Sequence, residues 1–168
     1  MYIYLTSGTA DYMEKVRAQH ANESIFIMHG EGNTILLEEN DKKKSSFAVP
    51  RKYEVLDAVG DLQQKGYFVM NNIPVTDEGR PVFEHRFLNR AGAIEQEPGF
   101  IAFRLLRPLD SDTYIVLTQW AGPASFEAWQ SSQAFKKAHS ERPATSPTQN
   151  IFSGKSYVTK YSAPVDEG

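Results

Sequence analysis

The hydrophobic pattern of residues 1–65 predicts four strands and one helix. Apolar and polar positions alternate from Tyr2 to Thr6, as in a half-buried strand. Thr9 or Asp11 can then cap a helix that reaches about His20. Further strands are expected in Ser24–His29, Thr34–Glu38 and within Phe47–Val59, with a hairpin turn at Gly30–Asn33. The order is β, α, β, β, β, which is too short to bury a large core alone.

Residues 66–168 predict a richer unit with two helices. One helix follows a cap at Thr76 or Asp77 and runs to about Arg90, and the other opens at Gly122-Pro123 and runs to about His139. The expected strands are Tyr67–Val75, Phe100–Arg107, Thr113–Trp120 and Lys155–Tyr161. The order βαββαβ is the ferredoxin-like pattern, and residues 1–65 resemble a reduced copy of it without the second helix. The predicted fold class is α+β.

Composition narrows the chemistry. Hydrophobic residues make up 40% and charged residues 23% of the 168, which is typical of an ordinary folded domain. The formal charge of −3 argues against a nucleic-acid surface. The absence of cysteine excludes disulfides, thiolate metal sites and thiol nucleophiles. The start of the chain lacks the features of a secretory signal and no apolar run is long enough to span a membrane, so a cytoplasmic protein without membrane partners is expected.

The four histidines show no metal-ligand spacing. They are His20, His29, His85 and His139, and no pair has the separation of a zinc site on a helix. Nucleotide-binding glycine motifs and a serine nucleophile elbow are also missing. A metal would therefore have to use one histidine and arrive with a cofactor that supplies the other ligands, and haem is the obvious one.

Trp129 and His139 form the most informative pair. Ten residues apart on one helix, they would be about 15 Å apart along its axis and about 80° apart around it. Small side chains between them would leave room for a flat ligand, with the histidine near the helix end. Taken singly, each residue has a simpler explanation, because such a tryptophan is usually core and such a histidine usually a cap or a surface residue.

Asn71 is the one amide on the more apolar face of its strand. It alternates with Tyr67, Val69, Ile73 and Val75, so helices should cover this face. Burying an unpaired amide costs about 1–3 kcal/mol. Asn71 therefore either bonds to local backbone or points into a pocket. Asn72, on the opposite face, does not face this cost.

Several segments resemble the IsdG-type haem-degrading monooxygenases, which belong to the antibiotic-biosynthesis-monooxygenase group of dimeric α+β barrels. The resemblance covers most of residues 67–161. It is most specific in the second-helix segment that ends in Phe-Lys-Lys-Ala-His139, and the other segments are Asn71-Asn-Ile-Pro-Val, Arg86-Phe-Leu-Asn-Arg90, Pro98-Gly-Phe100 and Trp120 to Trp129.

The resemblance implies a site and a reaction. Asn71, Trp129 and His139 match the catalytic triad of the family, with His139 as the haem ligand, Asn71 as a hydrogen-bond donor and Trp129 pressing on the porphyrin. Phe87 would pack on the ring, and Arg86 or Arg90 would approach a propionate. Haem would be both cofactor and substrate, cleaved with O2 and electrons from an external donor, an unknown reductase, with release of iron.

One departure concerns length. Short members of the family match residues 66–168, expected here to be the haem-binding domain, and pair as homodimers. Residues 1–65 would replace the partner subunit and complete an α+β barrel as a monomeric pseudo-dimer, as in the longer, fused members. Because this first half lacks tryptophan, one haem per chain is expected.

Three other functions stay open at this point. A cofactor-free monooxygenase acting on a quinol or polyketide explains the same fold but gives His139 no task. A haem-binding carrier or sensor would hold haem without degrading it. In a stress-related α+β barrel, the aromatic residues would simply be core.

Overall fold

The computed structural model of the chain describes residues 1–88, 94–131 and 151–164. The first half contains β1 (Tyr2–Gly8), α1 (Ala10–Gln19), β2 (Ile25–Gly30), β3 (Thr34–Asn40) and β4 (Arg51–Val59). The second contains β5 (Tyr67–Pro74), α2 (Arg80–Leu88), a 3-10 turn (Ile94–Gln96), β6 (Phe100–Pro108), β7 (Thr113–Trp120), α3 (Pro123–Gln130) and β8 (Tyr157–Ser162). None of the described helices is long and apolar enough to cross a membrane.

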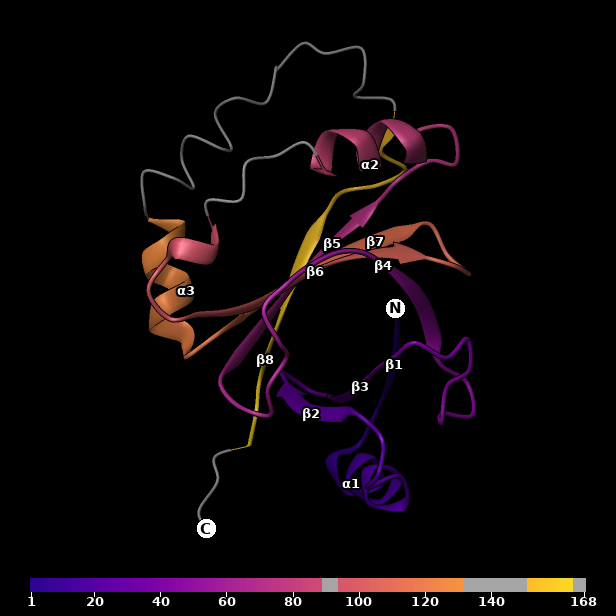
Figure 1. The fold of residues 1–168 in the computed structure, drawn as a ribbon, viewed down its shortest axis with the longest axis vertical. Coiled ribbons are helices and arrows are strands. Elements are labelled where there is room, and N and C mark those ends of the chain that lie inside the picture. The colour runs from indigo at the N-terminus through magenta and orange to yellow at the C-terminus, as the bar shows by residue number, and fades with distance from the viewer. Residues whose placement is uncertain (89–93, 132–150, 165–168) are drawn as a thin grey trace.

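All eight of these strands form one closed antiparallel barrel, in the order β1-β3-β2-β8-β5-β7-β6-β4. Each half contributes four neighbouring strands in the same order, the fourth, first, third and second of that half. This is the ferredoxin-like arrangement, so the predicted α+β barrel of two related halves is confirmed. The helices lie outside the barrel, α1 against the first half and α2 and α3 against the second (Figure 1).

The expected elements are all present among the described residues, with shifted ends. Thr9 caps α1 as predicted, and Gly122 precedes α3 with Pro123 in its first turn. The prediction that Thr76 or Asp77 caps the next helix is wrong, because α2 begins at Arg80. Thr76 instead accepts a hydrogen bond from the Gly79 backbone N–H at 3.1 Å and forms a separate turn. The expected continuation of α3 to His139 lies outside the described residues.

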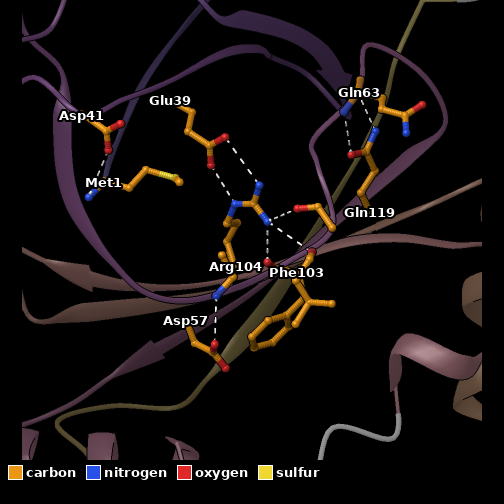
Figure 2. Close-up of polar contacts among 11 residues, drawn as sticks. Met1, Glu39, Asp41, Asp57, Gln63, Phe103, Arg104 and Gln119 are labelled. Carbon is orange, nitrogen blue, oxygen red and sulfur yellow. Dashed lines mark hydrogen bonds and ion pairs between the residues drawn. The ribbon is translucent and has the colours of Figure 1, made fainter.

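The barrel interior combines an apolar core with one ion pair. Apolar side chains from both halves meet inside it, among them Ile3, Leu37 and Leu117. Arg104 on β6 reaches across to Glu39 on β3, with its Nε 2.7 Å from the carboxylate (Figure 2). The arginine side chain is only 3% exposed and also donates to the backbone carbonyls of Val59, Gly60 and Phe103. This pair therefore joins the two halves through the middle of the barrel.

The connector between the halves closes the barrel where β2 and β8 share only a short ladder. These two strands pair at His29 and Gly30 alone. Beyond this ladder, the side-chain amide of Gln64 takes the place of a strand partner for β2. It accepts a hydrogen bond from the Ile27 N–H at 2.8 Å and donates one to the Ile27 carbonyl at 2.7 Å. Gln119, inside the barrel, donates to the backbone carbonyl of Gln63 (Figure 2). The side-chain amides thus satisfy backbone groups that would otherwise be unpaired.

A charged clamp fixes α2 on the barrel. Glu84 of α2 pairs with Arg107 on β6, with Nη2 2.5 Å from Oε1, and also accepts a hydrogen bond from the buried Tyr114 hydroxyl. Arg107 extends the network to Glu54 on β4 at 2.8 Å. The hydrogen bond from Arg107 lowers the pKa of Glu84, whereas burial and then the nearby carboxylate raise the pKa of Tyr114 to about 12. The orientation of α2 therefore depends on an ionised Glu84.

The ion pair inside the barrel predicts a strong single-variant effect. Arg104→Met should lower the free energy of unfolding by about 3–5 kcal/mol, because the Glu39 carboxylate stays behind without its cation. The double variant Arg104→Met/Glu39→Met should recover part of this loss, since no charge is then stranded. Urea unfolding of the three proteins measures both effects, and equal stability of the single and double variants would contradict the proposed cause.

The α2 clamp predicts a pH dependence. The stability that ionised Glu84 contributes is fully present above the pKa of an unfolded glutamate and disappears as the pH falls through the lowered folded pKa. Glu84→Gln should therefore be less stable than wild type at neutral pH, by about 1–3 kcal/mol. The difference should shrink in acid. Urea unfolding across this pH range tests it, and a difference independent of pH would show that the charge of Glu84 is not involved.

Candidate functional site

Asn71 lies on the outer face of β5, as the alternating pattern predicts. Its neighbours across the sheet are Val116 on β7 and Val158 on β8. The Asn71 side chain is half-buried, and it makes no hydrogen bond to any part of the chain that the structure describes. Val158 beside it is 50% exposed. An amide with two free donors thus sits on a partly open, otherwise apolar strip of the sheet.

The buried amide of the pair is Asn72, which corrects the sequence-based expectation. Asn72 points into the barrel and is 4% exposed. Its Nδ2 lies 3.1 Å from the Thr159 hydroxyl and 3.2 Å from the backbone carbonyls of Met70 and Tyr157. The need to satisfy a buried amide, which was expected at Asn71, therefore arises at Asn72, and its local hydrogen bonds meet it. Alternation identified the two faces but not which face is more deeply buried, since a closed barrel also has an interior.

Two separate apolar clusters flank Asn71 along β5. The cluster beneath α2 contains Ile73, Val75, Phe83 and Tyr114, with Leu56, Phe87, Val116 and Ile151 packed against it. The cluster beneath α3 contains Val69, Trp120 and Phe126, with Tyr67, Ile94, Phe100 and Trp129 packed against it. Asn71 belongs to neither cluster. On the outer face of the first half, by contrast, Met13 of α1 and Phe47 of the 41–50 connection share one continuous cluster.

Helix α2 brings two of the predicted site residues to this face. Phe87 is half-buried and lies parallel to Phe103 on β6, with ring centroids 6.1 Å apart and an interplanar angle of 9°. It also meets Phe83 edge-on at 5.8 Å. Arg86, next to it, is exposed. The aromatic ring is therefore anchored on the barrel. Arg90 lies outside the described residues.

Helix α3 brings Trp129 to the other side of Asn71. Trp129 is partly buried and stacks on the fully buried Trp120 at the end of β7, with centroids 5.5 Å apart and an interplanar angle of 30°. Phe126 contacts both indoles at 6.0 Å. Trp120 in turn donates its indole N–H to the Thr118 hydroxyl at 2.9 Å. Sequence reasoning missed this support, although the strand alternation already places Thr118 and Trp120 on one face.

His139 and its geometry relative to Trp129 lie outside the described residues. Among residues 1–88, 94–131 and 151–164, no group of three or more His, Asp or Glu side chains could hold a metal ion. A shallow hollow of about 360 Å³ lies elsewhere, on the outer face of β1 and β4. Tyr2, Tyr4, Lys43, Lys52, Glu54 and Leu109 line it, and it contains none of the predicted site residues.

The family comparison matches the second half of the chain. The family described as antibiotic biosynthesis monooxygenase matches residues 66–141, which include β5, α2, β6, β7 and α3. The chain is also 24% identical over 167 residues to a signal transduction protein TRAP of Staphylococcus epidermidis, covering 99% of both chains.

Three solved structures share the fold. A major regulator of staphylococcal pathogenesis superposes with a TM-score of 0.87 at 20% identity, over 98% of this chain and all of that one. LmHde, a heme-degrading enzyme from Listeria monocytogenes, has a TM-score of 0.72 at 20% identity, again over 98% of this chain and all of its own.

The third is a mutant of MhuD, the heme-degrader of Mycobacterium tuberculosis. That structure, with two manganese protoporphyrin IX molecules per active site, is 31% identical to this chain. The match covers 61% of this chain and 98% of MhuD, with a TM-score of 0.50. The short relative thus corresponds to part of this chain, and the full-length ones to nearly all of it. With its closed ferredoxin-like barrel and the family match over its second half, the chain belongs to the antibiotic biosynthesis monooxygenase superfamily.

Proposed function

We propose that this protein is a haem-degrading monooxygenase of the IsdG type. Haem would bind over β5 between α2 and α3 and be cleaved with O2 and electrons from an external donor, with release of iron. The observation that carries the proposal is the amide of Asn71, which lies between two apolar clusters and makes no hydrogen bond to residues 1–88, 94–131 or 151–164. The amide atoms of Asn71 are not buried and can therefore meet a ligand, whereas the buried Asn72 is satisfied by local partners.

The described residues fit a porphyrin. A flat apolar macrocycle needs apolar walls, and Phe87 and Trp129 are half-buried aromatic residues on the two helices that flank Asn71. It also needs an open floor, and Val116 and Val158 border Asn71 on the sheet. Lys160 adds one cation on the same face, with its ammonium 5.6 Å from the Phe126 ring centroid. These residues all belong to 66–168, which we propose as the haem-binding unit, with residues 1–65 completing the barrel.

Each residue has a proposed task. His139 would hold the iron through one ring nitrogen, and Asn71 would donate a hydrogen bond near the reacting porphyrin edge. Trp129 would press on the macrocycle, Phe87 would pack on it, and Arg86 or Arg90 would pair with a propionate. Bound haem supplies the redox chemistry and is itself the substrate. The chain's part is to bind it, orient it and hold a donor at its edge.

The relatives support two different readings. MhuD is a heme-degrader and is 31% identical to this chain over nearly all of its own length, which favours degradation. The TRAP relative is named for signal transduction and matches both halves over 99% of its length. A haem-binding regulator or carrier is therefore the second candidate. The cofactor-free monooxygenase has weaker support, because a quinol or polyketide could use Asn71 and the aromatic walls but would give His139 no task.

Haem turnover by the purified protein tests the proposal directly. Mixing the apoprotein with one equivalent of hemin should shift and sharpen the Soret band. Adding ascorbate in air, with catalase present to remove peroxide, should make that band decay while a ferrous chelator captures the iron. A stable Soret band under several reductants would favour the carrier, and no Soret shift would refute haem binding. His139→Ala should lose the spectral signature of axial ligation, with His20→Ala as the matched control.

Asn71→Ala should separate binding from turnover. Removing one positioned donor typically costs about 100- to 1000-fold in kcat, while the apolar walls that dominate haem affinity remain. The variant should therefore bind hemin as wild type does and degrade it far more slowly. Single-turnover decay of the Soret band measures this, with Asn22→Ala as a control in an exposed turn outside the site. Wild-type decay in Asn71→Ala would rule out the donor role.

A further inference from the structure

Trp129 packs against Phe126 of its own helix and against Trp120 of the neighbouring strand. Its stacking partner Trp120 belongs to β7 and is 0% exposed. Phe100 meets Trp120 edge-on at 5.8 Å, and Phe126 meets it at 6.0 Å. The separation of 5.5 Å and the tilt of 30° between the indoles lie within the range of favourable offset stacking. Trp120, Phe100 and Phe126 form an aromatic wall behind Trp129, so Trp129 can shift only away from them.

The orientation of Trp120 is fixed by one hydrogen bond. An indole has a single donor, and a buried donor needs an acceptor. Its Nε1 donates to the hydroxyl of Thr118, two residues earlier on the same strand face, at 2.9 Å. Thr118 is 5% exposed, and its branched side chain has few rotamers. Rotating the Trp120 ring would break this bond and strand the N–H in an aromatic core, so the ring has one stable position.

We infer that Trp120 and Thr118 are positioning residues for Trp129, and that they set the plane from which Trp129 contacts the ligand. The inference deepens the proposed function and rests on it for its catalytic consequence. Pressing a porphyrin out of plane requires a side chain that does not yield. The exposed part of Trp129 alone cannot provide this resistance, whereas a stacked, hydrogen-bonded indole behind it can.

The aromatic wall is connected to Asn71 through the neighbouring strand β5. Thr118 pairs with Val69 on β5, which lies two residues before Asn71 on the same outer face. Val69 also belongs to the apolar cluster that contains Trp120 and Trp129. The donor on β5 and the wall beneath α3 are therefore built on one rigid piece of sheet. A small rotation of Trp120 would move Trp129 relative to Asn71.

The test begins with the apoprotein and needs no haem. Thr118→Val keeps the volume of the side chain and removes the acceptor. Thr34→Val is the matched control, because Thr34 is equally buried and its hydroxyl bonds to His29 Nδ1 at 2.8 Å in the first half. The two tryptophans are the only ones in the chain, so the circular dichroism couplet of stacked indoles reports on this pair alone. We expect Thr118→Val to weaken the couplet and Thr34→Val to leave it unchanged.

A second variant gives an independent measurement. Trp120→Phe leaves Trp129 as the single tryptophan, so fluorescence anisotropy decay and acrylamide quenching report on its motion directly. In this variant we expect the anisotropy of Trp129 to decay faster than the tumbling of the whole protein allows, and we expect acrylamide to quench its fluorescence strongly. In the haem complex, both variants should retain hemin binding and lose about 10- to 100-fold in turnover, since small misplacements of a reacting pair are costly. The out-of-plane distortion of haem, followed by resonance Raman, should decrease in parallel.

The outcomes separate the two proposals. If Thr118→Val matches Thr34→Val in couplet and turnover, and Trp129 stays rigid in Trp120→Phe, the positioning role is refuted even though haem is degraded. If wild type does not bind or degrade haem, the proposed function fails, and the couplet and anisotropy of the apoprotein still decide whether Trp120 holds Trp129. If the couplet, rigidity, distortion and turnover fall together in the Trp120 and Thr118 variants alone, the inference holds.

Discussion

The closure of the barrel is the constraint on which the rest of the structure depends. A single four-stranded ferredoxin-like sheet has two exposed edges and an uncovered inner face. In this chain the two halves meet edge to edge, and Arg104 joins Glu39 through the interior (Figure 2). An ion pair in an apolar core is a poor source of stability but a strong source of register, since a shifted strand would strand both charges. Together with the β4–β6 ladder, the pair therefore disfavours any other placement of the first half against the second.

The two halves share a strand order but differ in how their outer faces are filled. In the first half, Glu38 is 1% exposed and accepts hydrogen bonds from Ser45 and Ser46. These bonds hold the 41–50 connection against the sheet, so that Phe47 joins the cluster beneath α1. In the second half, two helices leave the clusters apart with Asn71 between them. The asymmetry gives a physical reason to expect one ligand site per chain, on the second half.

Local patterning predicted most of this fold, and long-range packing accounts for the remainder. Alternation and turn residues gave the element order and placed Asn71 on the helix-covered face, because both depend on neighbours in sequence. The burial of Asn72 and the Arg104–Glu39 pair could not be predicted, since they require knowledge that the sheet closes on itself. The start of α2 at Arg80 was missed because Thr76 forms a turn with Gly79 instead of capping the helix. The support of Trp129 by Trp120 depends on how α3 meets the end of β7.

A shared barrel does not decide between an enzyme and a regulator. Proteins named for heme degradation and for signal transduction superpose on or align with nearly the whole of this chain, so the fold itself is compatible with either role. What can differ is whether the outer face of the second half keeps a free donor and a rigid aromatic wall. Under the proposed function, turnover would use the Asn71 amide, which makes no hydrogen bond within the described residues, and a firmly held Trp129, whereas a regulator that only binds haem needs the apolar clusters alone. The chemistry of these residues, and not the fold, therefore separates the two roles.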